Sequence, residues 1–302
     1  MTWRLSLRVY GALLLAMFVW GLSFLAVKDV VGTIPVFSLL LARFAIAALL
    51  LGLLAWRRKE LWLPARDLLA LAGLSLLSPV GYFLFETYGV SMTQASHASI
   101  LIAIIPIAVY LIAFGRRQEP ATWRKSIGIL LAFGGVLLIV LSAPGEEGAS
   151  LIGDVLVLGA VLCAALRTTL IKDVLRRVSP VQLTFYQFFF SLFIFGPLAA
   201  TSGFSWLRGM TPLLWAEVLF LGVVCSAAAF LALHYALKHI SATRVSVSAN
   251  LVPIVTLFAE IVLFGVSLTS IKLVGALLTV TGVVLTQLRA SPRTPRAIPG
   301  GG

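Results

Sequence analysis

Apolar runs long enough to cross a lipid bilayer follow one another along almost the whole chain. A membrane-spanning helix needs on the order of 20 mainly apolar residues, and the polar segments between such runs are short. The pattern therefore predicts one all-α bundle of ten transmembrane helices without a soluble domain. The expected spans are residues 9–27, 35–56, 67–88, 95–114, 124–142, 151–171, 181–201, 212–234, 244–265 and 271–288.

Part of this pattern occurs twice. Residues 95–141 align with residues 242–288 at a constant offset of 147 residues and without a gap. Prolines, lysines and glycines coincide, which is less easily obtained by chance than matching leucines in so apolar a chain. The matched pairs include Ser99/Ser246, Pro106/Pro253, Lys125/Lys272, Gly128/Gly275 and Gly135/Gly282.

The offset covers five predicted spans, and an odd number of spans turns the second copy upside down. We therefore expect two inverted five-helix repeats, at residues 1–145 and 146–290, an arrangement typical of secondary transporters. Residues 291–302 are rich in Pro, Gly and Arg and are expected to form a disordered cytoplasmic tail. The matched glycines are expected to allow close helix packing.

Composition and charge set the class and the orientation. The chain is 60% hydrophobic and 11% charged, with a mean hydropathy of +1.06, which excludes a soluble globular domain. With the N-terminus in the cytoplasm, eighteen of the 23 Lys and Arg residues lie in cytoplasmic connections, three lie outside and two lie within spans. Because basic residues favour the cytoplasmic side, we predict a multi-pass membrane protein with both termini inside. The basic residues are spread over these connections, so the net charge of +12 predicts no nucleic-acid partner.

Two prolines lie near the middle of the fourth and ninth spans. Pro106 and Pro253 each remove one helix hydrogen bond, and a packing kink is the simplest reading of either alone. Their matched positions in the two copies favour a shared hinge. Ser99 and Ser246 precede them by one heptad on about the same helix face, and Asn250 adds an amide that is costly to expose to lipid.

The third span carries a polar stripe. Ser75, Ser78, Tyr82 and Glu86 are spaced for one face of a helix, and their counterparts 147 residues later are small or apolar. We interpret the stripe as one wall of an asymmetric aqueous cavity, with hydrogen bonding to adjacent helices as the alternative. Trp20 lies well inside the first span, and either a lipid-facing position or a cavity wall fits it.

Ionisable residues within spans are functional candidates. Arg43 lies about 12 Å into the second span at a rise of 1.5 Å per residue, where it could hold a substrate carboxylate or form a structural ion pair, with Glu86 as candidate partner. Glu86 lies near the outer end of the third span, so exposure of its side chain to solvent is a second possibility. Arg167 is expected to reach the inner surface. His97 and His234 are expected to be solvated or hydrogen-bonded rather than parts of a proton relay.

Three segments resemble a known family. Trp20-Gly21-x-x-Phe24, the stretch from Phe230 through Ala242 to Pro253, and residues 275–285 are similar to motifs of EamA-type proteins in the drug/metabolite transporter superfamily. The resemblance implies ten helices in two inverted repeats, a central cavity, and export of small metabolites as by bacterial amino-acid exporters. The chain departs from the family at Val266, where family copies often carry Glu.

The expected function is therefore secondary transport by alternating access across the bacterial inner (plasma) membrane, which the protein spans several times. The expected substrates are amino acids, hydrophobic or aromatic ones among them, or related metabolites, and the expected direction is export. The alternatives are a flippase for a lipid-linked group and, with less support because no protease or paired-aspartate motif is present, a membrane-embedded enzyme. The partners are a small-molecule substrate and the bilayer, for a monomer or weak dimer, and we expect no metal or cofactor. The residues expected to line the site are Trp20, Ser78, Tyr82, Ser99, Ser246 and Asn250.

Overall fold

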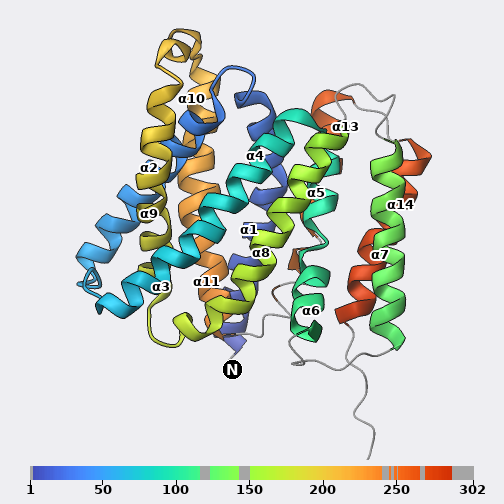
Figure 1. The fold of residues 1–302 in the computed structure, drawn as a ribbon, viewed down its shortest axis with the longest axis horizontal. Coiled ribbons are helices and arrows are strands. Elements are labelled where there is room, and N and C mark those ends of the chain that lie inside the picture. Colours follow the sequence, from blue (N-terminus) through green and yellow to red (C-terminus); the bar gives the residue numbers. More distant parts are fainter. Residues whose placement is uncertain are drawn as a thin grey trace, which may run out of the picture.

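The computed structural model describes residues 3–115, 123–142, 150–239, 245, 248–249, 251–265 and 269–287. Within these ranges every regular element is helical (Figure 1). The same ranges hold seven helical segments long and apolar enough to cross a membrane and three shorter apolar helices. The predicted class, an all-α multi-pass membrane protein, is confirmed.

The helices follow the order of the predicted spans. The first part of the chain contains α1 (Trp3–Val30), α2 (Val36–Arg57), α3 (Ala65–Ser75), η1 (Leu76–Gly81), α4 (Tyr82–Met92), α5 (Ala95–Ile102), α6 (Ile105–Gly115) and α7 (Trp123–Ser142). The second part contains α8 (Leu151–Leu175), α9 (Pro180–Thr201), η2 (Ser205–Gly209), α10 (Pro212–Leu219), η3 (Phe220–Ala228), α11 (Ala229–His239), α13 (Leu251–Phe264) and α14 (Ser270–Gln287).

The third long span is interrupted, and so is its counterpart. Residues Ala65–Met92 and Pro212–His239 are both 28 residues long and lie 147 residues apart in the sequence. Each contains a π-helical segment, η1 or η3. In η1 the backbone leaves the helical region at Ser78 (φ −158°, ψ 125°), just before Pro79.

This interruption corrects the expected polar stripe. Ser75 lies before the break, and its hydroxyl donates to the Leu71 carbonyl of its own helix at 2.6 Å. Ser78, Tyr82 and Glu86 lie at or beyond the break. The four residues therefore do not form one continuous helix face, because Pro79 cannot continue the hydrogen-bond ladder of a regular helix.

The fourth span is also divided. α5 ends at Ile102 and α6 begins at Ile105, so Pro106 lies in the first turn of α6, where its missing N–H costs least. A tight turn joins the two helices, with the Ile104 N–H bonded to the Leu101 carbonyl at 3.1 Å. Pro253 likewise lies in the first turn of α13. Both prolines mark a helix start, and their role as hinges stays a prediction.

Large apolar side chains cover the outside of the bundle, and polar ones are buried within it. Leu49, Leu130 and Phe193 are among the many exposed apolar residues, each more than 60% exposed. Buried polar residues include Arg43, Glu86, Asp154 and others. This distribution suits a protein whose solvent is lipid.

Glycines bring α7 and α14 into close contact; the two helices run side by side in Figure 1. A Cβ atom added to Gly135 would lie 2.5 Å from the Gly275 carbonyl oxygen and 2.5 Å from the Thr279 hydroxyl. Nothing lies within 4 Å of the corresponding position at Gly134. The helix pair therefore depends on Gly135, as expected for close packing of membrane helices.

Gly135→Val should destabilise the purified protein by about 1–3 kcal/mol, because an overpacked interface must separate. Thermal unfolding followed by size-exclusion chromatography in detergent measures this loss. Gly134→Val is the matched control and should unfold at the wild-type temperature. Equal midpoints for the two variants would contradict the close packing of α7 on α14.

Candidate functional site

A cavity of about 150 Å³ lies within the bundle. Its walls come from α1, α2, η1, α4, α5, α6, α8 and α11, together with residues near the start of α13. The lining residues are Met17, Trp20, Ser23, Phe24, Arg43, Ser78, Tyr82, Phe83, Glu86, Ile102, Ile105, Ala164, Arg167, Thr168, Phe230, Leu233, Leu237, Val245, Ala249 and Val252.

Several lining residues form pairs related by the 147-residue offset. They are Met17/Ala164, Trp20/Arg167, Phe83/Phe230, Glu86/Leu233, Ile102/Ala249 and Ile105/Val252. Equivalent positions of the two halves therefore meet at this cavity. Two pairs, Trp20/Arg167 and Glu86/Leu233, combine a charged residue with an uncharged equivalent. The cavity is therefore chemically asymmetric.

The structure brings three of the six predicted lining residues together. Trp20, Ser78 and Tyr82 line the cavity, as do the two candidate charge partners. Ser99 does not line it: the side chain is buried, and its hydroxyl donates to the Ser96 carbonyl at 2.8 Å. Ser246 and Asn250 lie outside the described residues.

Aromatic side chains form one wall. The Trp20 indole N–H donates to the Cys225 carbonyl at 2.9 Å, and its ring packs edge-on against Phe230, with centroids 5.1 Å apart. Phe83 contacts both Phe230 and Tyr82, at centroid distances of 5.8 and 4.9 Å. Trp20 thus lines the cavity rather than facing lipid.

Arg43 lies on α2 with only 1% of its surface exposed. Its Nε donates to the Ser226 hydroxyl at 3.1 Å, and its guanidinium carbon lies 4.4 Å from the centre of the Phe83 ring. Among the residues that the structure describes, the buried Nη1 atom has no hydrogen-bond partner. Among the described residues no ion pair joins Arg43 to Glu86.

Glu86 is buried rather than exposed, with 3% of its surface accessible. Its Oε2 accepts a hydrogen bond from the Thr87 hydroxyl at 3.0 Å. The exposure that the sequence left open is not found, because Glu86 lies inside the bundle at the cavity wall.

Arg167 does not reach the surface either. Only 5% of it is exposed, and its Nη2 donates to the Gln187 side-chain oxygen at 3.2 Å and to His234 Nε2. The expectation failed because α9 and α11 supply these partners inside the bundle. Arg167 therefore adds a second guanidinium to the cavity.

His234 is held in one tautomer by its neighbours. The Thr184 hydroxyl donates its proton to the Pro180 carbonyl at 2.6 Å, so it accepts from His234 Nδ1 at 2.8 Å. Nε2 then carries the lone pair that accepts from Arg167, since a guanidinium has no acceptor. His234 is thus hydrogen-bonded and orients Arg167.

Gln187 connects this group to the interrupted span. Its side-chain N–H donates to the Ser78 carbonyl at 3.0 Å, while its oxygen accepts from Arg167. The break at Ser78 exposes a carbonyl that a regular helix would satisfy, and Gln187 satisfies it instead. One buried amide therefore fixes both the break and the guanidinium.

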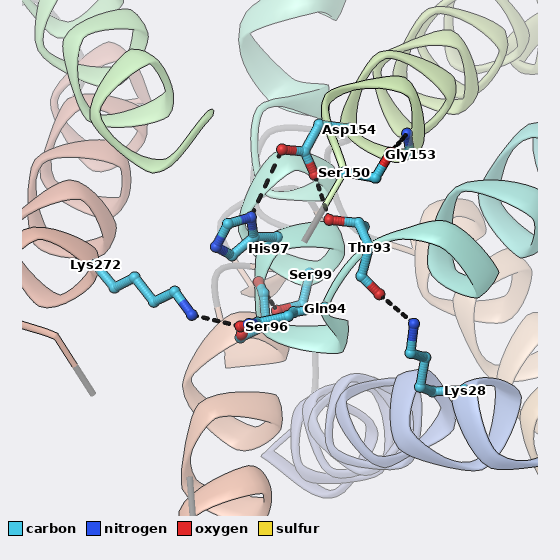
Figure 2. A network of polar contacts seen from close by, with 10 residues as sticks. All are labelled: Lys28, Thr93, Gln94, Ser96, His97, Ser99, Ser150, Gly153, Asp154 and Lys272. Atoms are coloured by element: carbon cyan, nitrogen blue, oxygen red, sulfur yellow. Dashed lines mark hydrogen bonds and ion pairs between the residues drawn. The ribbon is translucent and has the colours of Figure 1, made fainter. Parts of the chain in front are cut away.

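A second polar cluster, here called the Asp154 network, links several helices (Figure 2). Asp154 accepts from the Thr93 hydroxyl at 2.7 Å and lies 3.6 Å from His97 Nδ1. Lys28 donates to the Thr93 carbonyl at 2.7 Å. These residues join α1, the α4–α5 turn, α5 and α8.

The network extends to α13 and α14. Glu260 accepts from the Ser96 backbone N–H at 3.0 Å, and Lys272 donates to the Gln94 side chain. His97, Glu260 and Lys272 are all buried. The network therefore holds five helices together.

Two of these residues carry roles that sequence reasoning overlooked. Asp154 is a carboxylate four residues into an apolar span, a signal that should have marked it. Gln187 lies among the phenylalanines of α9, and nothing in its spacing shows that it reaches Ser78 and Arg167. The first could have been found from the sequence, whereas the second required the fold.

Comparison with known proteins gives the family. The EamA-like transporter family model matches residues 7–141 and 151–288. A Bacillus subtilis protein named "Uncharacterized transporter YcxC" is 30% identical over 95% of each chain. An Archaeoglobus fulgidus protein named "Uncharacterized transporter" is 31% identical over 91% of this chain and 95% of its own.

A third relative has a more specific name. The "Probable terminal-alkyne amino-acid exporter" of Streptantibioticus cattleyicolor is 28% identical over 97% of this chain and 98% of its own. A crystal structure with 18% sequence identity shares the fold, with a TM-score of 0.65 over 92% of this chain and 95% of that one. The relatives are transporters, not enzymes, and the chain belongs to the EamA-like transporter family.

Proposed function

We propose that this protein is a secondary transporter that exports amino acids with apolar or aromatic side chains, or related small metabolites, across the inner membrane. The observation that carries the proposal is the cavity, which combines an aromatic wall with buried charges of both signs. Charged residues inside a membrane are costly and commonly mark a substrate path.

The lining suits a molecule with an apolar body and a charged head. Trp20, Phe83 and Phe230 supply the apolar surface, and Arg43, Glu86 and Arg167 supply the charges. An amino acid has both parts. The name of the Streptantibioticus cattleyicolor relative, a probable amino-acid exporter, supports the same substrate class.

We further propose two inverted five-helix repeats, at 1–145 and 146–290, with both termini in the cytoplasm. Helix packing supports this arrangement. α4 packs on α8 as α11 packs on α1, and α6 packs on α8 as α13 packs on α1. If each helix is replaced by its equivalent in the other half, the first contact of each pair becomes the second contact, as related repeats require.

Transport would proceed by alternating access. In the proposed orientation the Asp154 network lies at the outer end and closes it, while Leu237 and Val245 extend the cavity lining toward the inner end. The outward-facing state would require this network to separate. Pro106 and Pro253, at the broken spans, would act as the hinges.

Proteoliposomes containing the protein and loaded with radiolabelled amino acids should release apolar or aromatic ones faster than protein-free liposomes. Trp20→Ala and Tyr82→Ala should each slow release by about tenfold, because an aromatic contact surface is lost. Phe193→Ala, on the lipid-exposed face of α9, should release at the wild-type rate. Unchanged release of every substrate by both cavity variants would contradict the assignment.

The gate can be tested with a cysteine placed in the cavity. In a background with Cys163 and Cys225 replaced by alanine, Phe24→Cys should react slowly with a membrane-impermeant maleimide added outside cells. Asp154→Ala should raise the labelling rate several-fold, because it removes the acceptor of the Thr93 hydroxyl and the carboxylate that lies 3.6 Å from His97 Nδ1.

The matched control removes a different carboxylate. Asp67 accepts from Arg177 Nε at 2.8 Å, at the end of the bundle proposed to be cytoplasmic. Asp67→Ala should leave outside labelling unchanged. Equal labelling of the Asp154 and Asp67 variants would argue against a gate at the Asp154 network.

A further inference from the structure

We infer that the substrate carries a carboxylate and that Arg43 binds it through its two terminal nitrogens, while the apolar body of the substrate lies against Trp20 and Phe230. This inference rests on the proposed function, because it takes the cavity to be the substrate site. It excludes amines that lack an acidic group from the substrates.

The free donors of Arg43 point to a forked ligand. A guanidinium has five N–H donors, and the Nε of Arg43 is occupied by the Ser226 hydroxyl. Among the described residues Arg43 makes no other hydrogen bond, and its terminal Nη1 is fully buried without a partner. Two adjacent terminal nitrogens form the planar fork that binds a carboxylate in bidentate fashion.

Arg43 is already held in place for this task. Ser226 fixes one edge of the guanidinium, and the ring of Phe83, 4.4 Å from the guanidinium carbon, lies against its face. A group positioned in advance loses little freedom on binding. The remaining free edge is the one that carries the unused donors.

A purely structural ion pair does not account for Arg43. Removing a charge from water is expensive unless a partner of opposite sign compensates it. Among the described residues Arg43 forms no ion pair, although only 1% of it is exposed. An anionic ligand would supply the missing partner.

The charges around the cavity also favour a negatively charged ligand. The described lining contains two guanidinium groups, from Arg43 and Arg167, and one carboxylate, from Glu86. Arg167 Nη2 is occupied by Gln187 and His234, which orients its positive charge without neutralising it. The lining therefore has an excess of positive charge that attracts an acid and repels an organic cation.

The substrate class follows from both parts of the cavity. The fork of Arg43 takes the carboxylate, and the aromatic wall takes an apolar or aromatic body. Glu86 offers an acceptor for an amino group, so α-amino acids fit. Acids that lack the amino group retain the main contact and should also bind.

Four probes with the same aromatic body separate the contributions of the head group. Phenylalanine and 3-phenylpropanoate carry the carboxylate, whereas phenylalaninamide and 2-phenylethylamine do not. Binding of each radiolabelled probe to the full-length protein in nanodiscs should be at least about tenfold tighter for the two acids, in keeping with a charge-assisted hydrogen-bond pair. This comparison uses the wild-type protein and depends on no variant.

Variants of Arg43 then locate the contact. Arg43→Gln should abolish the preference for acids, and Arg43→Lys, which keeps the charge but loses the fork, should restore part of it. Arg57→Gln removes an exposed arginine from the end of the same helix and should leave all four affinities unchanged.

Equal binding of acids and amines, wild-type acid binding by Arg43→Gln, or no binding of any probe would each overturn the inference. Export assays on the same probes separate it from the proposed transport activity. Export of 2-phenylethylamine as fast as phenylalanine would leave transport standing and overturn the carboxylate contact. Tight acid binding without export of any probe would support the contact and overturn transport.

Discussion

The interior of a bilayer supplies no water, so each polar group there must find its partner within the protein. This constraint governs the whole structure. Where the third span breaks at Ser78, Gln187 takes the freed carbonyl, and Trp20 takes the carbonyl of Cys225 in the interrupted counterpart span. Trp20 also lines the cavity, and Gln187 holds a guanidinium that lines it. The side chains that satisfy the free carbonyls of the interrupted helices therefore also form the cavity lining or hold a residue that does.

Much of the fold could be predicted from the sequence, because the length of an apolar run is fixed by the thickness of the membrane. The span expected at 67–88 is part of the segment Ala65–Met92, and the one expected at 212–234 is part of Pro212–His239. Pro106 lies just after the division of the fourth span between α5 and α6. Pro79 carried the same signal, but the regular spacing of Ser75, Ser78 and Tyr82 concealed it.

The site was less predictable, because depth in a span does not determine exposure. Arg167 lies toward a span end, yet neighbouring helices cover it and provide its partners. His97 and Glu260 are buried for the same reason. Trp20, Ser78 and Tyr82 meet around one cavity, whereas Ser99 bonds to its own helix. These outcomes depend on how helices pack, which spacing along one helix does not encode.

Equivalent positions of the two halves meet in the cavity, and this affects how its ligand preference can evolve. Trp20 and Arg167 occupy the same place in the two halves, yet one offers an apolar ring and the other a charge. Had the chain been a pair of identical subunits, every substitution would have appeared twice. Because both halves lie in one polypeptide, a single mutation alters one side of the cavity only. Ligand preference can therefore diverge among relatives while the helix scaffold is inherited intact.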